Sequence, residues 1–119
     1  MAKADLHVHS RASDRPCEWV MQKIGTAESY TSPEEVYRMA KAKGMDYVTL
    51  TDHNEIKGAE LLVATHPDDT FISVESTVTF PEDNCKIHLL IYDITREIFE
   101  AIERKRHNVY ELREFLVEN

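Results

Sequence analysis

The chain has 119 residues, of which 42% are apolar and 30% charged, and its formal net charge is −8. This length predicts a single domain over 1–119 with one hydrophobic core. The negative charge disfavours binding to a nucleic-acid backbone, although an acidic site that holds divalent metals still accepts an anionic substrate. No apolar run approaches the roughly 18 residues of a membrane-spanning helix, so we expect no membrane association. Cys17 and Cys85 form no spaced motif and the start lacks signal-peptide character, which together predict a cytoplasmic protein.

The first half of the chain predicts a β–α–β unit. Residues 4–9 alternate between apolar and polar side chains, which indicates a strand, and the polar segment 10–31 is typical of a long loop. A capping box at 32–35 begins a helix that Gly44 ends. A second strand at 46–51 follows directly, and a strand–helix–strand order implies that the two strands are parallel.

The second half predicts one more helix, a hairpin and a helical C-terminus. The helix is expected over 56–64, and strands are expected over 71–80 and 86–92. The turn-forming cluster 81–84 between these strands predicts an antiparallel hairpin. Apolar residues then recur at helical spacing to the end, with a break near Asn108. Strands that alternate with helices place the chain in the α/β class.

Candidate metal ligands lie in or just after the two predicted parallel strands. His7 and His9 leave the same face of a strand about 7 Å apart, so their imidazoles can converge on one metal ion. Taken alone, this motif is more often a solvated or structural pair, and Asp14 alone is an ordinary loop acid. His53 follows the second strand, and the C-terminal ends of parallel strands meet at one rim of the sheet. His9, Asp14 and His53 are therefore expected at the same rim.

The predicted hairpin supplies two more candidates. A four-residue turn places His88 opposite Thr77, with Glu75 as its diagonal neighbour about 7–8 Å away and within joint reach of one metal ion. The alternative for His88 is a buried core histidine. For Glu75 the structural alternative is weaker, because an unpaired carboxylate in an apolar strand is costly.

Four further polar residues have weaker assignments. Asp5 and Asp52 are candidates to orient a metal-bound imidazole through a hydrogen bond. Asp52 serves equally well as a helix N-cap. His66 is expected to face solvent in a loop, and His107 is expected at the surface or at a helix C-cap.

The motifs at 5–10, 13–14 and 51–54 (Asp-Leu-His-Val-His-Ser, Ser-Asp and Thr-Asp-His-Asn) together resemble the PHP (polymerase and histidinol phosphatase) domain family. The combination is far more specific than any one motif. Glu75, at the end of Ser-Val-Glu, and His88 stand where the family has its next metal-binding residues, and the resemblance covers residues 4 to about 92. The later part is also similar, more weakly, to PHP domains encoded with glycosyltransferases.

The resemblance implies a distorted (β/α)7 TIM-like barrel, here partial or truncated, with two or three divalent zinc, manganese or iron ions at its C-terminal rim. Glu75 would hold one metal with His7 and His9 and would bridge to a second metal. The ligands implied by position are six: His7, His9, Asp14, His53, Glu75 and His88. In this scheme His88 binds the second metal, Asp14 and His53 serve the third, and no side-chain nucleophile is needed.

The implied activity is hydrolysis of a small phosphorylated molecule. Family members continue further and supply a later histidine and an Asp-x-His pair, for which nothing after His107 is a counterpart. One alternative is therefore a non-catalytic structural or regulatory metal-binding module. Another is an amidohydrolase-type enzyme, which also begins with His-x-His, although Thr-Asp-His-Asn argues against it. Half a barrel leaves strand edges uncovered, which predicts a homo-oligomer or fusion to a longer chain.

Overall fold

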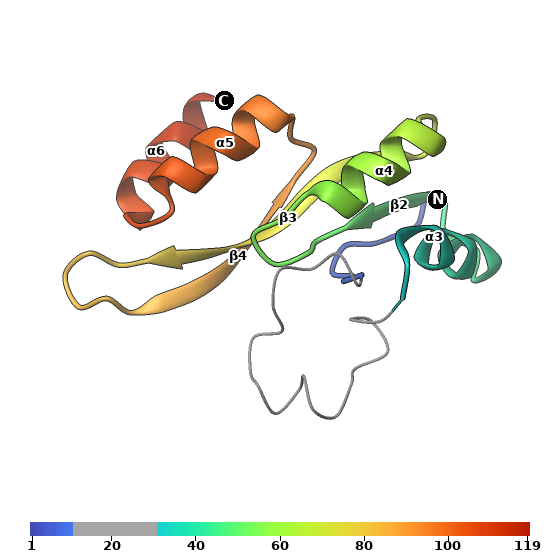
Figure 1. Cartoon of the computed structure of the whole chain (residues 1–119), viewed down its shortest axis with the longest axis horizontal. Coiled ribbons are helices and arrows are strands. Elements are labelled where there is room, and N and C mark those ends of the chain that lie inside the picture. Colours follow the sequence, from blue (N-terminus) through green and yellow to red (C-terminus); the bar gives the residue numbers. More distant parts are fainter. Residues whose placement is uncertain (11–30) are drawn as a thin grey trace.

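The computed structural model describes residues 1–10 and 31–119, and it has a mixed α/β fold. Asp14 and most of the predicted loop over 10–31 therefore lie outside the described residues. The elements follow in the order β1 (Ala4–Asp5), α3 (Pro33–Ala42), β2 (Tyr47–Leu50), α4 (Lys57–Thr65), β3 (Thr70–Thr79), β4 (Lys86–Tyr92), α5 (Arg96–Lys105) and α6 (Val109–Glu118) (Figure 1). Each of them was predicted from the sequence, and only the first strand differs markedly in length.

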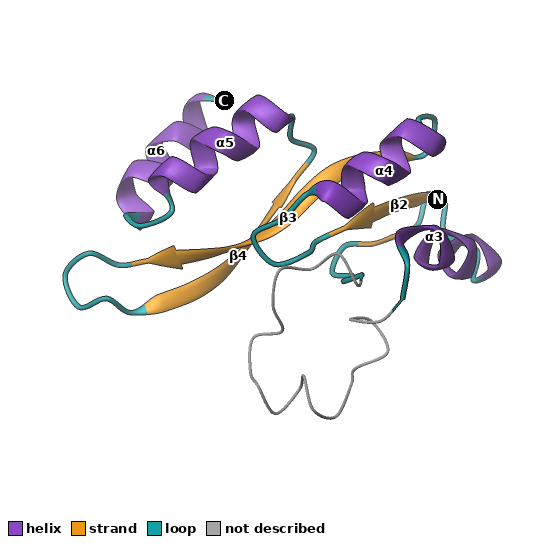
Figure 2. Ribbon diagram, in the orientation of Figure 1, coloured by secondary structure: helices purple, strands orange, loops and turns teal. Residues whose placement is uncertain are grey.

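The strands form one four-stranded sheet in the order β1-β2-β3-β4. β1, β2 and β3 are parallel, and β4 runs antiparallel to β3, which confirms both the β–α–β unit and the hairpin. Figure 2 shows α4, α5 and α6 on the same side of this sheet. The sheet also curls, so that the Tyr92 hydroxyl of β4 donates a 2.7 Å hydrogen bond to the carbonyl of Leu6, just past β1 at the opposite edge. The curl turns inward the face on which none of the described helices packs.

Local sequence signals explain where the helices begin and end. Ser32 accepts a hydrogen bond from the backbone N–H of Glu35 at 3.2 Å, as the capping box predicts. Gly44, with a φ of 89°, follows the end of α3 in the left-handed region that glycine tolerates. Asn108 breaks the C-terminal helical stretch by capping Tyr110 N at 3.0 Å. In the described parts of the chain, no helix is both long and apolar enough to cross a bilayer.

The two faces of the sheet differ in chemistry. The face toward the helices is apolar: its fully buried side chains include Leu50, Val74 and Val78, and the buried Ile102 of α5 and Leu112 of α6 belong to the core with Val74 and Val78. Because successive side chains of a strand point to opposite faces, Ser73, Glu75 and Thr77 of β3 lie on the open face. The core thus fixes β3 from one side and presents its polar residues on the other.

The first strand is shorter than the predicted 4–9, since regular pairing covers only Ala4 and Asp5. The chain nevertheless stays beside the end of β2. Thr51 N donates to the Val8 carbonyl at 2.7 Å, and the Thr51 hydroxyl, not a backbone carbonyl, accepts from Val8 N at 3.0 Å. A side chain therefore replaces one rung of the ladder. Leu6 is 45% exposed at this edge of the sheet.

The prediction that His66 faces solvent holds only in part, because 24% of its side chain is exposed. Its ring stacks on Tyr37 with centroids 3.7 Å apart, and its Nε2 lies 2.9 Å from both carboxylate oxygens of Glu34. Glu34 and Tyr37 both belong to α3, so the packing of α3 beside the end of α4 covers this ring. His107 is exposed, as expected.

Candidate metal centre

Five of the six predicted ligands lie together on the open face: His7, His9, His53, Glu75 and His88. Glu75 comes from the middle of β3, and only 5% of its side chain is exposed. His53 lies next to it through an isolated parallel bridge beyond the end of β2. The sixth residue, Asp14, is outside the described residues.

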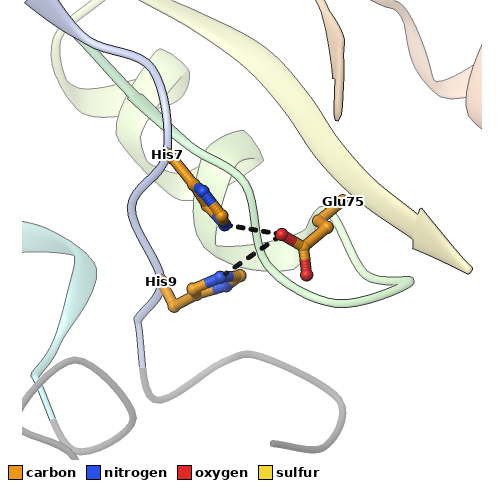
Figure 3. Close-up of side chains that lie close together, drawn as sticks. All are labelled: His7, His9 and Glu75. Carbon is orange, nitrogen blue, oxygen red and sulfur yellow. Dashed lines mark ion pairs between the residues drawn. The ribbon is translucent and has the colours of Figure 1, made fainter. Parts of the chain in front are cut away.

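His7, His9 and Glu75 form a cluster that we call the first triad (Figure 3). Both histidines project toward Glu75 from the segment after β1. The Nε2 atom of His7 lies 2.6 Å from Oε1 of Glu75, and the Nε2 atom of His9 lies 3.8 Å from the same oxygen. The spacing of two residues thus directs both imidazoles to one carboxylate oxygen, as the strand pattern predicts.

His53, Glu75 and His88 form the second triad. The Nδ1 atoms of His53 and His88 lie 2.7 and 3.8 Å from Oε2 of Glu75. Thr77 pairs with His88 in the β3–β4 ladder, which confirms the predicted register and makes Glu75 the diagonal neighbour of His88. The resemblance grouped His53 with Asp14, whereas the structure places it with Glu75 and His88. The alternative of a buried core histidine is wrong for His88, whose side chain is 44% exposed.

The donor atoms fit divalent metal ions. Ligand atoms of a tetrahedral site with bonds of about 2.0–2.2 Å lie about 3.4 Å apart, and the separations from 2.6 to 3.8 Å bracket this value. Among the described residues, no group lies within hydrogen-bonding distance of the buried Nδ1 of His9. The geometry is therefore compatible with one ion at each triad, with Glu75 shared between them.

His9 is held in its neutral form. Burial first, and then the neighbouring His53, whose ring stacks on it at 4.4 Å, lower the pKa of His9 to about 4. Glu75 opposes this shift only in part. A neutral imidazole has the free lone pair that a metal ligand needs.

Asp52 supports the first triad through the backbone. The expectation that it caps a helix is wrong, because the N-cap of α4 is Ile56, which makes no side-chain cap bond. Asp52 instead accepts hydrogen bonds from Ser10 N at 2.6 Å and from Ser10 Oγ at 2.8 Å. Burial raises the pKa of Asp52 to about 6, while these two bonds favour its ionised form. Asp52 therefore holds the residue next to His9.

Asp5 acts in a similar but more exposed way. Its carboxylate accepts a 3.2 Å hydrogen bond from the backbone N–H of His7. It thus holds the main chain of a predicted ligand, whereas the expectation was a bond to an imidazole.

Asn54 and Thr77 were missed by sequence reasoning. Asn54 has a φ of 51°, and its amide oxygen accepts a 2.9 Å hydrogen bond from Thr77 N. One signal was available, because asparagine is among the few residues that adopt positive φ readily, and Asn54 comes directly after His53.

No protein-family model matches the chain. Over 56 residues, or 47% of the chain, it is 39% identical to an uncharacterised protein of Methanocaldococcus jannaschii, of which the match covers 31%. The structure is similar to that of an amidohydrolase from Chromobacterium violaceum, solved with bound sulfate and no metal, with a TM-score of 0.57 and 25% identity. That similarity covers 84% of this chain and 31% of that one. The chain thus spans about a third of the length of each of these proteins, and its fold resembles part of an amidohydrolase.

Proposed function

We propose that the chain is the metal-binding N-terminal part of a PHP-type domain that hydrolyses a phosphate ester. The observation that carries the proposal is the sharing of one buried carboxylate, that of Glu75, by two histidine pairs. An amidohydrolase as structural neighbour supports a metal-dependent hydrolase.

The architecture supports a partial barrel of the (β/α)7 type. Three parallel strands carry helices on one face, and the sheet curls far enough for Tyr92 to reach Leu6 across it. The five described ligands lie on the inner face of this curl: His7, His9 and His53 lie beyond the C-terminal ends of β1 and β2, and Glu75 and His88 lie on β3 and β4. In barrels of this kind active sites lie at that rim.

Each histidine pair has its own metal-binding role. His7 and His9 would hold one ion and His53 and His88 the other, with each oxygen of Glu75 facing one pair. Bound divalent ions would supply Lewis acidity toward phosphate oxygens and an activated water. Among the described ligands the four imidazoles are uncharged when they bind metal and Glu75 is the only carboxylate, so two divalent ions would leave this part of the site with a positive charge. This local charge attracts a phosphate despite the net charge of −8.

A second candidate is hydrolysis of an amide-type substrate, which the name of the structural neighbour favours. The sulfate bound in that protein is a tetrahedral anion like phosphate, and it favours the phosphate ester. Assays of p-nitrophenyl phosphate and of a p-nitroanilide, run side by side on the same preparation, separate the two.

The first test is the metal content of untagged protein purified without chelator, measured by inductively coupled plasma mass spectrometry. Two ions per chain are expected, and one or none contradicts a site built from these residues alone. His9→Ala and Glu75→Gln should abolish phosphatase activity, while His107→Ala, an exposed histidine in the turn between α5 and α6, should not. Full activity in both site variants would show that the ligand assignment is wrong. Metal binding without hydrolysis would favour the non-catalytic module.

A further inference from the structure

The chain between β2 and α4 continues the sheet alongside β3 for one more rung. Glu75 N donates to the Asp52 carbonyl and Asn54 N donates to the Glu75 carbonyl, each at 3.0 Å. These two bonds make the parallel bridge that places His53 beside Glu75. The main chain then leaves the sheet at Asn54, whose φ of 51° turns it toward α4.

The side chain of Asn54 replaces the next rung of the ladder. Its amide oxygen accepts from Thr77 N at 2.9 Å, and its amide nitrogen donates to the Thr77 hydroxyl at 3.2 Å. Thr77 lies directly opposite His88 in the hairpin, and its hydroxyl is 3.5 Å from Nδ1 of that histidine. One amide therefore links the segment that carries His53 to the strands that carry Glu75 and His88.

We propose that Asn54 is a positioning residue that sets the geometry of the second triad and leaves the first triad unaffected. The hydrogen bonds of Asn54 run to Glu75 and Thr77 of β3, and through Thr77 to β4. The first triad has a separate support, because Asp52 holds Ser10 next to His9 through two short hydrogen bonds. The two metal positions thus have separate supports, although they share Glu75 and the ring of His53 stacks on that of His9 at 4.4 Å. This inference rests on the proposed metal centre.

The test measures zinc affinity at each triad separately by competition with a chromophoric chelator. His7→Ala disables the first triad, so the zinc affinity measured in this variant is that of the second triad. His88→Ala disables the second triad, so the zinc affinity measured in that variant is that of the first. Asn54→Gly is then added to each background. Glycine tolerates the positive φ, so this change removes the two side-chain bonds without backbone strain.

Asn54→Gly should weaken zinc binding about tenfold or more in the His7→Ala background, which is the range for residues that orient ligands. In the His88→Ala background the change should stay within about twofold. Thr77→Val, which removes only the hydroxyl, should show a smaller loss with the same selectivity. Thr79→Val, two residues further along β3, is the matched control and should leave both affinities unchanged.

Equal losses in both backgrounds would overturn the inference, because they would show a general effect on folding. No loss in either background would overturn it as well. Neither of these two results contradicts the proposed function as long as the wild-type chain binds zinc. Failure of the wild-type chain to bind zinc would instead refute the metal centre itself, and the positioning role with it.

Discussion

The substitution Gly58→Ala tests the close packing behind the first triad. Gly58 lies in the first turn of α4. A Cβ at this position would lie 3.0 Å from Oδ2 of Asp52 and 3.0 Å from Oγ of Ser10. It would also lie 3.1 Å from Cδ1 of Leu50. All three separations are shorter than the usual carbon contact of about 3.5–4.0 Å.

The two oxygens cannot easily move away from such a methyl group. Asp52 and Ser10 are buried and are bound to each other by hydrogen bonds of 2.6 and 2.8 Å. Forcing an extra methyl into a packed site costs about 1–3 kcal/mol, and each strained hydrogen bond contributes about 1 kcal/mol. Helix propensity acts in the opposite direction, because alanine is about 1 kcal/mol better than glycine inside a helix. We therefore expect Gly58→Ala to lower the free energy of unfolding by about 1–2 kcal/mol.

Urea denaturation followed by circular dichroism measures this change, and its sign is decisive. Helix propensity alone predicts stabilisation. The sharper measurement is a double-mutant cycle with Ser10→Ala, which removes one of the two oxygen contacts. Gly58→Ala should cost at least about 0.5 kcal/mol less in that background, the coupling expected for residues in contact. Stabilisation by Gly58→Ala, or strict additivity of the two changes, would refute the packing argument.

Three further predictions concern other parts of the molecule. Ile102→Ala, at a fully buried core position, should lower the free energy of unfolding by about 2–5 kcal/mol in urea denaturation, and a loss below about 1 kcal/mol would contradict the assigned core. The guanidinium of Arg96 beside Glu60 holds the pKa of that carboxyl below its usual 4.5, so the ion pair stabilises the fold above that pH and loses its effect as the pH falls through the lowered pKa. Arg96→Met should remove this contribution to the pH dependence of the free energy of unfolding. The effect should be at most about 1 kcal/mol because the pair is partly exposed. If the free energy of unfolding changes between about pH 3 and about pH 6 by the same amount in the variant as in the wild type, the assignment is wrong. The chain should self-associate at the β1 edge, where Met39 and Tyr47 are about half exposed beside a cavity of about 270 Å³, and a clean monomer in size-exclusion chromatography with light scattering would contradict this.

Much of the site was predictable because its parts follow from short-range rules. The two-residue spacing of His7 and His9 predicted that both imidazoles would face one way, and they do so although regular strand pairing ends at Asp5. The register of Glu75 and His88 follows from the length of the hairpin turn, since a shift by one residue would move every side chain to the other face. Both predictions needed only segments that are contiguous in the sequence.

Other features of the site were beyond local rules. His53 joins Glu75 because the chain after β2 continues beside β3 for one rung, and that depends on how two separate strands are aligned. The same holds for Asp52, which was expected to cap a helix or bind an imidazole but binds Ser10 from a segment 42 residues away. The close approach of Gly58 to this pair has no signature in the periodicity of α4.

The sequence by itself determined the kinds of element, their order, the α/β class and the residue types able to bind a metal. Periodicity, capping residues and turn clusters act over a few residues, so they can be recognised in the sequence alone. Only the tertiary structure decided which imidazole faces which oxygen of Glu75, and how far that carboxylate is buried. These features depend on the curl of the sheet, which brings the segment after β1 to the strand β4 at its opposite edge. Long-range pairing of this kind is set by the packing of the helices against one face of the sheet.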